Sequence, residues 1–247
     1  MKDYFYAFSM CQSMFCSIPF PCHVWEEKAR SKMLLFLPVI GLEIGFLWAF
    51  LGWLLPLTGW PLPLCSAILT ICPFICTGFI HLDGFMDVTD AVGSCRDLEK
   101  RRAILKDSHV GAFAVIGCIL LMLFQFACFA SLKPGQNLWI LVLAPAVTRT
   151  CAALAVDGLP SMSTSQYAGR QKQTAHLACF WGMLALLLAA GFLLFGIMGL
   201  VDLLFVIFWQ SLALHKGYHS LQGMNGDISG YSITIGELAA VASLVIF

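Results

Sequence analysis

Residues 62–93 read LPLCSAILTICPFICTGFIHLDGFMDVTDAVG, a long apolar run that ends in a stretch carrying three acids. Asp83, Asp87 and Asp90 are spaced i, i+4 and i+7, which places their carboxylates on one face of a helix. Acids at the end of an apolar helix repel one another and are costly to hold near lipid. A bound divalent cation such as Mg²⁺, which prefers carboxylate oxygens, offsets that cost. The stretch therefore predicts a metal site for phosphoryl-transfer chemistry at a membrane surface.

The composition of the chain indicates a helical membrane protein. Of its 247 residues, 60% are hydrophobic and 11% are charged, whereas a soluble domain has roughly 25% charged residues. The apolar runs are continuous rather than alternating, which favours helices over a β-barrel. The formal net charge is zero and no basic patch is interleaved with aromatic residues, so nothing indicates a nucleic-acid partner.

Hydropathy predicts an all-α, polytopic membrane protein with about seven transmembrane helices, because about 20 apolar residues are needed to cross the hydrocarbon core. The expected spans are residues 33–55, 62–80, 111–130, 138–156, 177–195, 200–214 and 233–247. The whole chain, 1–247, is expected to form a single integral-membrane catalytic domain. Within it, residues 1–32 are expected to be an amphipathic lead-in that lies in the membrane interface.

The distribution of basic residues predicts the orientation of the chain. Lysines and arginines gather before the first span, in residues 81–110, in residues 157–176 and near Lys216, and with seven spans these places fall on one side. The turns on the other side hold only Lys133. By the positive-inside rule the basic side is cytoplasmic. We therefore expect a multi-pass protein of the cell (inner) membrane with catalytic loops and an active site on the cytoplasmic side.

Other polar clusters fall on the same predicted side, where loops from separate helices converge at one mouth. Basic side chains there are candidate phosphate ligands. The glycines of residues 222–230 permit close approach of the backbone to an anion, and Asp227 is positioned to complete a metal shell. The candidate substrate-binding residues are His81, Lys106, Asp107, Ser108, Arg149, Lys216, Asn225 and Gly226.

Two of these clusters also have a purely structural explanation. The acidic stretch is alternatively a solvated helix face whose acids pair with Arg96, Arg101 or Arg102, since runs of charge usually lie on a surface. Asp107 and Ser108 precede an apolar helix and are alternatively its N-terminal cap. A cap of this kind can also hold a phosphate at the helix N-terminus.

The remaining candidates have structural alternatives too. Arg149 lies within a predicted span, where it either snorkels to the near surface, pairs with Asp157, or faces the site and binds a phosphate. Residues 222–230 taken alone are also typical of a turn. Glu43 has no basic partner in its own span, so we expect it to be protonated or hydrogen-bonded within the packing.

Three segments together resemble a known family. They are TGFIHLDGFMDVTDAVGS at residues 77–94, LKDSHVGAF at residues 105–113 and QGMNGDISGYSITIGEL at residues 222–238. The opening around residues 12–21 and the segment FLPVIGLEIG at residues 36–45 are similar as well. In matching order along nearly the whole chain, these segments resemble the cobalamin synthase family, the adenosylcobinamide-GDP ribazoletransferases. The HLDG-x-x-D-x-x-D block is the specific part of the likeness.

The resemblance implies an integral membrane transferase of the late steps of cobalamin biosynthesis. Such enzymes transfer the adenosylcobinamide phosphate group from adenosylcobinamide-GDP to the 5′-hydroxyl of α-ribazole, or to α-ribazole 5′-phosphate, and release GMP. The product is adenosylcobalamin or its 5′-phosphate, and Mg²⁺ is required. The implied partners are these substrates and the lipid bilayer, and the oligomeric state is open between a monomer and a homo-oligomer.

The resemblance also assigns roles to individual residues. The family's acidic motif carries over onto Asp83, Asp87 and Asp90, its DS element onto Asp107 and Ser108, and its Gly-rich acidic loop onto Gly226 and Asp227. Mg²⁺ is then expected on Asp83, Asp87, Asp90 and Asp227. Asp83 and Asp87 are the expected catalytic residues, with Asp87 accepting the proton of the attacking hydroxyl. The chain departs from the family pattern at Gln222, Asn225, His109 and Glu43.

Two other functions compete with this interpretation. A CDP-alcohol phosphotransferase of phospholipid synthesis also uses clustered aspartates on membrane helices, but its D-x-x-D-G motif is not matched, because the glycine here follows Asp83. A membrane transporter would place acids near the bilayer midplane in broken, repeated helices. Glu43 and Arg149 are the intramembrane charges that favour a transporter.

Overall fold

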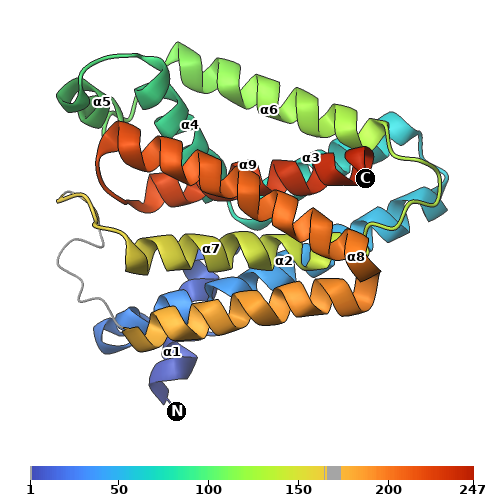
Figure 1. Ribbon diagram of the computed structural model, residues 1–247, viewed down its shortest axis with the longest axis horizontal. Coiled ribbons are helices and arrows are strands. Elements are labelled where there is room, and N and C mark those ends of the chain that lie inside the picture. The colour runs from blue at the N-terminus through green and yellow to red at the C-terminus, as the bar shows by residue number, and fades with distance from the viewer. Residues whose placement is uncertain (1, 164, 166–173) are drawn as a thin grey trace.

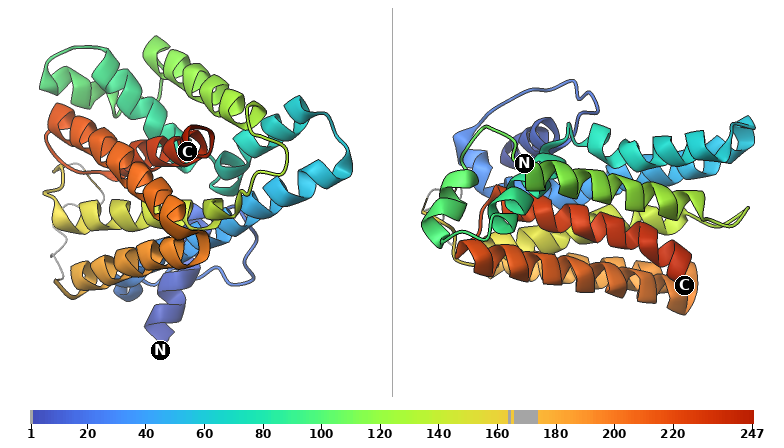
Figure 2. Two further views of the ribbon diagram at one scale, coloured as in Figure 1. Left: turned by 45° about the vertical axis from the view of Figure 1, so that its right-hand side comes forward. Right: turned by 90° about the horizontal axis from the view of Figure 1, so that it is seen from above.

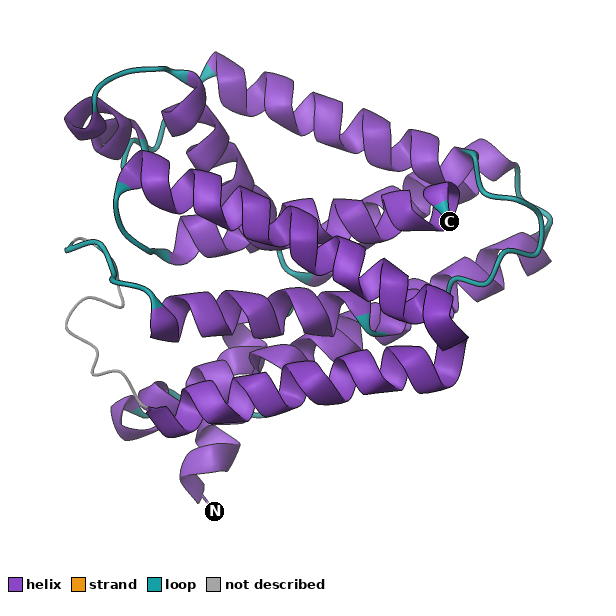
Figure 3. Cartoon of the chain, in the orientation of Figure 1, coloured by secondary structure: helices purple, strands orange, loops and turns teal. Residues whose placement is uncertain are grey.

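The chain folds as a bundle of helices, most of which run in the same general direction or its opposite (Figure 1). The computed structural model describes residues 2–163, 165 and 174–247, and these form helices and no strand (Figure 3). In chain order, with η for a 3-10 helix, the elements are α1 (Lys2–Phe15), η1 (Glu27–Phe36), α2 (Leu37–Leu54), η2 (Leu55–Thr58), α3 (Leu62–Cys76), α4 (Ile80–Gly93), α5 (Leu98–Ile104), α6 (Ala112–Ala130), η3 (Trp139–Val142), α7 (Ala144–Gly158), α8 (Thr174–Leu221) and α9 (Gly226–Ile246). The all-α prediction is confirmed.

Local signals fix where several of these helices begin. Helices α2, α3 and α7 each carry a proline in their first two positions, where the missing N–H would have no partner in the helix. Asp97 caps α5 by accepting a hydrogen bond from the backbone N–H of Lys100, and Asn225 caps α9 in the same way. Such caps satisfy backbone donors that the first turn of a helix leaves unpaired.

The predicted count of about seven membrane-crossing helices is approximate, because five to six described segments are long and apolar enough to cross a bilayer. Five described helical segments are long and apolar enough to cross a bilayer, and α3 with α4 adds a sixth if that bent pair is one span. Helix α8 has 48 residues, which is about 72 Å at 1.5 Å per residue and far more than one crossing needs. Its backbone leaves helical geometry at Gly196, and its two halves run in opposite directions (Figure 1). The halves correspond to the predicted spans 177–195 and 200–214.

The second predicted span, 62–80, ends earlier than expected, and the acidic stretch forms a separate helix, α4. Helix α3 ends at Cys76, and α4 leaves at an angle of 92° to it. Pro73 lies in the last turn of α3, and Gly78 and Phe79 both have positive φ angles, so the helix stops and the chain changes direction. Helix α4 then packs inside the bundle against α6 and α9.

The last predicted span, 233–247, begins earlier than expected. Helix α9 starts at Gly226, and α8 continues to Leu221 although the predicted span ends at 214. Hydropathy locates only the apolar part of a helix, and the polar residues that flank these two spans are helical as well. As a result Asp227 lies in the first turn of α9 rather than in a flexible loop.

Helices α7 and α9 form the centre of the molecule. In the most apolar stretch of η3–α7, and likewise of α9, 78% of the residues are buried inside the protein. The corresponding share is 28% for α6 and 22% for α8. Figure 2 shows α6 on the outside of the bundle on one side of α9, and the first half of α8 on the outside below α7. Any polar group on the inner faces of α7 and α9 therefore needs a partner within the protein.

The N-terminal lead-in is a helix that packs against the following segment. Tyr4 and Phe8 of α1 make edge-to-face contacts with Phe36, and Phe8 also contacts Phe20. The end of α1 reaches the bundle, where the Phe15 ring stacks on His81 with 6.1 Å between ring centroids. The position of residues 1–32 in the membrane interface stays a prediction, but α1 is also part of the wall around the acidic stretch.

Candidate active site

Helices α4 and α9 approach each other closely through two glycines. A Cβ atom on Gly84 would lie 2.9 Å from the backbone oxygen of Asp227, and one on Gly230 would lie 3.0 Å from the backbone oxygen of His81. The Thr234 hydroxyl also donates a hydrogen bond of 3.1 Å to the His81 carbonyl. Such small residues let helix backbones touch in a membrane protein. The contact fixes Asp227 beside the acids of α4, although they are far apart in the sequence.

The acids of α4 and α9 gather at this crossing. Asp83 is exposed, and Asp87, Asp90 and Asp227 are half-buried. The charges of Asp83, Asp227 and Asp90 all act on Asp87, and the charge of Asp83 acts on Asp227. Asp90 packs against the start of α6, because a Cβ atom on Gly111 would collide with both carboxylate oxygens of Asp90. The four acids predicted as metal ligands therefore lie along α4 and in the first turn of α9.

Two cavities meet at Asp83. A small one of about 100 Å³ is lined by His81, Asp83, Gly226, Asp227 and Ser229, with apolar side chains behind them. A larger and more open one of about 550 Å³ lies between the end of α1 and the break between α3 and α4. The lining of the larger cavity includes Ser13, Cys16, Ser17, Thr77 and Asp83. Asp83 thus faces both an enclosed space and an open one.

The turn before α9 is held in one conformation by its own hydrogen bonds. The Asn225 side chain accepts from the backbone N–H of Ile228 at 2.9 Å and donates to Oδ2 of Asp227 at 2.5 Å. Met224 is bound on both sides by the segment after α7, since its N–H donates to Pro160 and its carbonyl accepts from Met162. The predicted Gly-rich acidic element is therefore a rigid helix start and not an open loop.

Helix α5 anchors the same turn from the other side. Arg102 donates from Nε to the carbonyl of Leu221 at 3.0 Å and from Nη2 to the carbonyl of Gln222 at 2.8 Å. Arg101 donates to the carbonyl of Ser220 at 3.4 Å. These carbonyls end α8 and have no partner within the helix, so the arginines complete its C-terminus.

The alternative of a solvated acidic face paired with arginines is not what the structure contains. Arg101 and Arg102 bind carbonyls of α8, and among the described residues no ion pair links Asp83, Asp87 or Asp90 to a basic side chain. The acids face cavities and one another instead.

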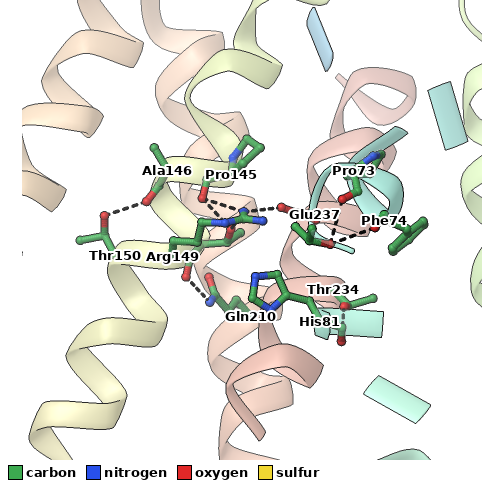
Figure 4. Close-up of polar contacts among 12 residues, drawn as sticks. Pro73, Phe74, His81, Pro145, Ala146, Arg149, Thr150, Gln210, Thr234 and Glu237 are labelled. Atoms are coloured by element: carbon green, nitrogen blue, oxygen red, sulfur yellow. Dashed lines mark hydrogen bonds and ion pairs between the residues drawn. The ribbon is translucent and has the colours of Figure 1, made fainter. Parts of the chain in front are cut away.

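Arg149 lies in the core and not in an open site. Its side chain is fully buried on α7, and Nη1 forms an ion pair of 2.5 Å with Oε1 of Glu237 on α9 (Figure 4). The alternative pairing with Asp157 is wrong, because Arg149 pairs with Glu237 instead. Snorkelling to the surface is also wrong, since none of the side chain is exposed. Arg149 is not part of the lining of either cavity at Asp83. Its contact with a substrate phosphate stays a prediction.

His81 lies between the acids and this buried pair. Figure 4 shows its ring pointing from α4 towards Arg149 and Gln210. It lines the small cavity, is 6% exposed, and its Nε2 atom is buried without a hydrogen-bond partner among the described residues. Gln210 donates to the carbonyl of Thr148 at 2.7 Å and so ties α8 to α7.

Lys106, Asp107 and Ser108 lie in an exposed loop before α6. Asp107 accepts from the backbone N–H of His109 at 3.0 Å and pairs with its ring at 2.6 Å. This contact raises the pKa of His109 and lowers that of Asp107. The alternative that Asp107 or Ser108 caps the third span is wrong, because α6 begins at Ala112 with Gly111 at its cap position. Both residues remain candidates for substrate contact.

Two other predicted positions have different surroundings. Lys216 lines an apolar groove between α6, α8 and α9 rather than either cavity at Asp83. Glu43 accepts a hydrogen bond of 3.2 Å from Gln12 of α1. The expectation that Glu43 is hydrogen-bonded within the packing is confirmed.

The carboxylates of this cluster offer the oxygen ligands that a hard cation such as Mg²⁺ prefers. Among the described residues no group of three or more His, Cys, Asp or Glu side chains is already arranged around one point. Mg²⁺ is commonly held by one or two carboxylates together with substrate phosphates and waters, and rarely by a full protein cage. Asp83 and Asp227 line the same cavity and provide such a pair. Asp87 lies within electrostatic reach of both.

Sequence reasoning assigned no role to several residues that shape the site. Glu237 falls within the predicted span 233–247, so its presence as an intramembrane acid was a readable signal for a partner of Arg149. Ser13, Cys16 and Ser17 line the open cavity, but no pattern in the sequence indicates that α1 folds back to this point. Arg102 lies in a run of charged residues, and nothing in that run indicates that it donates to the carbonyls of Leu221 and Gln222.

The chain is similar to known proteins over nearly its full length. Residues 7–245 match the family model described as cobalamin-5-phosphate synthase. Proteins named adenosylcobinamide-GDP ribazoletransferase are similar: one from Clostridium botulinum (strain Alaska E43 / Type E3) is 35% identical over 252 aligned positions and 100% of both chains. Another from Clostridium perfringens (strain SM101 / Type A) is 35% identical over 99% of both chains, and one from Brevibacillus brevis is 33% identical over 97% of both. No solved structure matches the chain.

Proposed function

The chain belongs to the cobalamin-5-phosphate synthase family, and we propose that it is an adenosylcobinamide-GDP ribazoletransferase that acts late in cobalamin biosynthesis. A ribose hydroxyl of α-ribazole, or of its 5′-phosphate, attacks the phosphorus of adenosylcobinamide-GDP that bears the cobinamide. A new P–O bond forms to the ribose, the pyrophosphate P–O bond breaks, and GMP leaves. The 5′-hydroxyl cannot be the acceptor in both cases, because that oxygen is already esterified in α-ribazole 5′-phosphate.

The observation that carries the proposal is the convergence of acids from two separate family segments. Asp83 and Asp87 come from α4, and Asp227 comes from the start of α9. The Gly84 and Gly230 contacts hold these two helices together at that point. A pyrophosphate substrate needs a site that neutralises charge and fixes both reacting groups. A cluster of acids that binds a cation beside an open cavity meets that need.

Asp83 and Asp227 are the residues proposed to hold Mg²⁺, with Asp87 and Asp90 next to them. When bound, Mg²⁺ supplies neutralisation of the pyrophosphate and of the departing GMP. Asn225 orients the Asp227 carboxylate through its 2.5 Å hydrogen bond. Asp90 contacts Gly111 and so joins the acidic helix to the start of α6.

The remaining steps fall to side chains around the cavities. Asp87 is proposed to accept the proton of the attacking hydroxyl, as the carboxylate beside the metal-binding pair. Lys106, on the exposed loop before α6, is a proposed phosphate contact. The bilayer anchors the enzyme, and the site is proposed to face the cytoplasm of the inner membrane, where the positive-inside rule places the basic loops.

The proposed reaction is tested by assaying the purified full chain in detergent with adenosylcobinamide-GDP, α-ribazole and Mg²⁺. We expect release of GMP in the complete mixture and none when EDTA replaces Mg²⁺. The same chain with a CDP-activated lipid and an alcohol should release no CMP, which would be the product of a CDP-alcohol phosphotransferase. Turnover in detergent, where no gradient exists, also separates an enzyme from a transporter.

Asp83→Asn is the matched variant for this assay. It removes one negative charge from both cavities with little change of volume, so we expect membrane insertion at the wild-type level. Transfer should fall by at least about 100-fold, the effect expected when one electrostatic contact to a transition state is lost. Transfer near the wild-type rate in Asp83→Asn would reject the metal assignment.

A further inference from the structure

An apolar groove of about 450 Å³ lies on the outside of the bundle, away from the two cavities at Asp83. Its floor is α9, from Tyr231 to Ile246, and its walls are Phe124 of α6 and Phe205 and Trp209 of α8. Trp209 is 43% exposed and Phe124 is 54% exposed, so the groove opens outwards between two peripheral helices. A surface of this kind on a membrane-spanning bundle faces lipid.

The length of the groove matches a lipid chain. Tyr231 and Ile246 are 15 residues apart on one helix, which is about 22 Å at 1.5 Å per residue. One leaflet of the hydrocarbon core is about 15 Å deep, half of the roughly 30 Å total. The groove therefore accepts an acyl chain along its whole depth.

The charge at one end of the groove selects the head of that lipid. Lys216 is the charged residue of the lining, and it lies at the end marked by Tyr231, which is also the Asp227 end of α9. Lys216 is exposed, and among the described residues it has no ion-pair partner. An ammonium group at the mouth of an apolar groove complements a phosphate attached to an acyl chain.

We propose that this groove is a binding site for an anionic phospholipid, with one acyl chain lying on α9 and the headgroup phosphate at Lys216. The site is distinct from the proposed catalytic acids, and it does not rest on the transferase reaction. Lys216 then serves the lipid and not the substrate phosphates. Tyr231 lines the groove and stacks on Phe85 of α4 with 5.6 Å between ring centroids, so a bound lipid packs against a residue that holds the α4–α9 contact.

Quenching of Trp209 by brominated lipids tests the proposal. The full chain is placed in phosphatidylcholine nanodiscs that contain increasing fractions of phosphatidylglycerol brominated in mid-chain, or of phosphatidylcholine brominated in the same way. The Trp209 signal is the difference between the wild type and Trp209→Phe. Trp209 is seven residues before Lys216, about 10 Å along the helix, which is the depth of the bromines.

We expect brominated phosphatidylglycerol to quench Trp209 half-maximally at a fraction about fivefold lower than brominated phosphatidylcholine does. A preference of about fivefold is what one lysine near a membrane surface provides. Lys216→Gln should abolish that preference, and Lys133→Gln, at the other end of the molecule, should preserve it. Ala239→Leu fills the floor of the groove and should reduce quenching by both lipids.

Equal quenching by the two lipids in the wild type would overturn the proposal, and so would an unchanged preference in Lys216→Gln. Absence of quenching by either lipid would also overturn it, because the groove would then be covered by protein, such as a second copy of the chain. Lys216→Gln leaves the groove walls intact, so the result stands even if Ala239→Leu does not fold.

Discussion

The buried ion pair between Arg149 and Glu237 joins the two central helices at the level of single residues. Both side chains are almost completely inaccessible, with 0% and 5% exposed. Removing water from two charges is costly, and their attraction only offsets that cost while both partners are present. The pair is therefore a condition for the packing of α7 on α9 rather than a source of net stability.

Loss of one partner should be far worse than loss of both. Glu237→Gln leaves the Arg149 guanidinium buried without a counter-charge, and we expect it to destabilise the fold by about 3–5 kcal/mol. The double variant Arg149→Met/Glu237→Met removes both charges and should recover most of that loss. Thermal unfolding in detergent, followed by circular dichroism, measures the difference. A double variant as unstable as Glu237→Gln would contradict this account of the pair.

For single residues, the sequence was a good guide to the acids that lie close together. It was a poorer guide to the contacts of the basic residues. The i, i+4, i+7 spacing of Asp83, Asp87 and Asp90 follows from helix geometry alone, so their common face could be read directly. Glu237 was readable as a candidate partner of Arg149 because it is an acid within a predicted span. Hydropathy alone does not reveal which faces of two distant helices meet. The metal and substrate roles of all these residues remain predictions that the transfer assay tests.

Among the elements, the crossing of α4 and α9 positions the site. Gly84 and Gly230 are the two places where the helix backbones are too close for a side chain. The geometry of the acids depends on this separation, since a shift of about 1 Å is enough to lower catalysis by about 100-fold.

Gly84→Ala should separate the helices without touching a carboxylate. The added methyl group would lie 2.9 Å from the Asp227 carbonyl, so we expect a loss of about 1–3 kcal/mol in stability from overpacking and a fall in transfer of at least about tenfold. Gly182→Ala is the matched control, because a Cβ atom there meets nothing within 4 Å. Equal activity of the two variants, measured by GMP release, would show that the close approach does not matter.

The short helix α5 should act on the site through the turn before α9. Arg102→Met removes two hydrogen bonds to carbonyls of the α8 terminus but keeps the apolar stem. Each such bond from a charged donor contributes about 1.5–3 kcal/mol, so the turn that carries Asn225 and Asp227 should loosen. We expect the Mg²⁺ concentration for half-maximal transfer to rise several-fold. Lys100→Met, which breaks only an exposed ion pair with Asp97, should leave it unchanged.

At the scale of elements, the sequence located helices well and their ends poorly. The spans at 111–130 and 138–156 agree closely with α6 and with η3–α7, because both are bounded by polar loops. The end of α3 was missed, since Gly78 and Phe79 belong to an unbroken apolar run and only their positive φ angles mark the turn. The start of α9 was missed because Asn225 and Gly226 suggest a loop, whereas Asn225 is the helix cap.

On the scale of the whole molecule, the orientation in the membrane is open to a direct test. Cys95 is exposed just after α4, on the side that carries the basic loops. A membrane-impermeant maleimide should therefore label the protein in inside-out vesicles and not in right-side-out ones. Cys95→Ser should reduce the label in inside-out vesicles. Labelling of Cys95 from the outside of intact cells would reverse the predicted topology.

The overall architecture could be predicted because a membrane imposes few solutions. A chain with 60% hydrophobic residues must satisfy its backbone within helices or a closed barrel, and the predicted seven crossings put all of the basic loops on one side. The reversal at Gly196 was also predicted, because a short connection separates the apolar spans 177–195 and 200–214. The sharp break between α3 and α4 was not, because broken and continuous spans have the same hydropathy.

That break has a consequence for the bilayer itself. Helix α3 has 15 residues, which is about 22 Å at 1.5 Å per residue and short of a hydrocarbon thickness of about 30 Å. Ile71 and Ile75 near its end are exposed, so lipid tails adjoin a helix that stops before the leaflet does. We expect this mismatch to be relieved by local thinning, which would draw headgroups and solvent inward and let water-soluble reactants meet below the plane of the surrounding membrane.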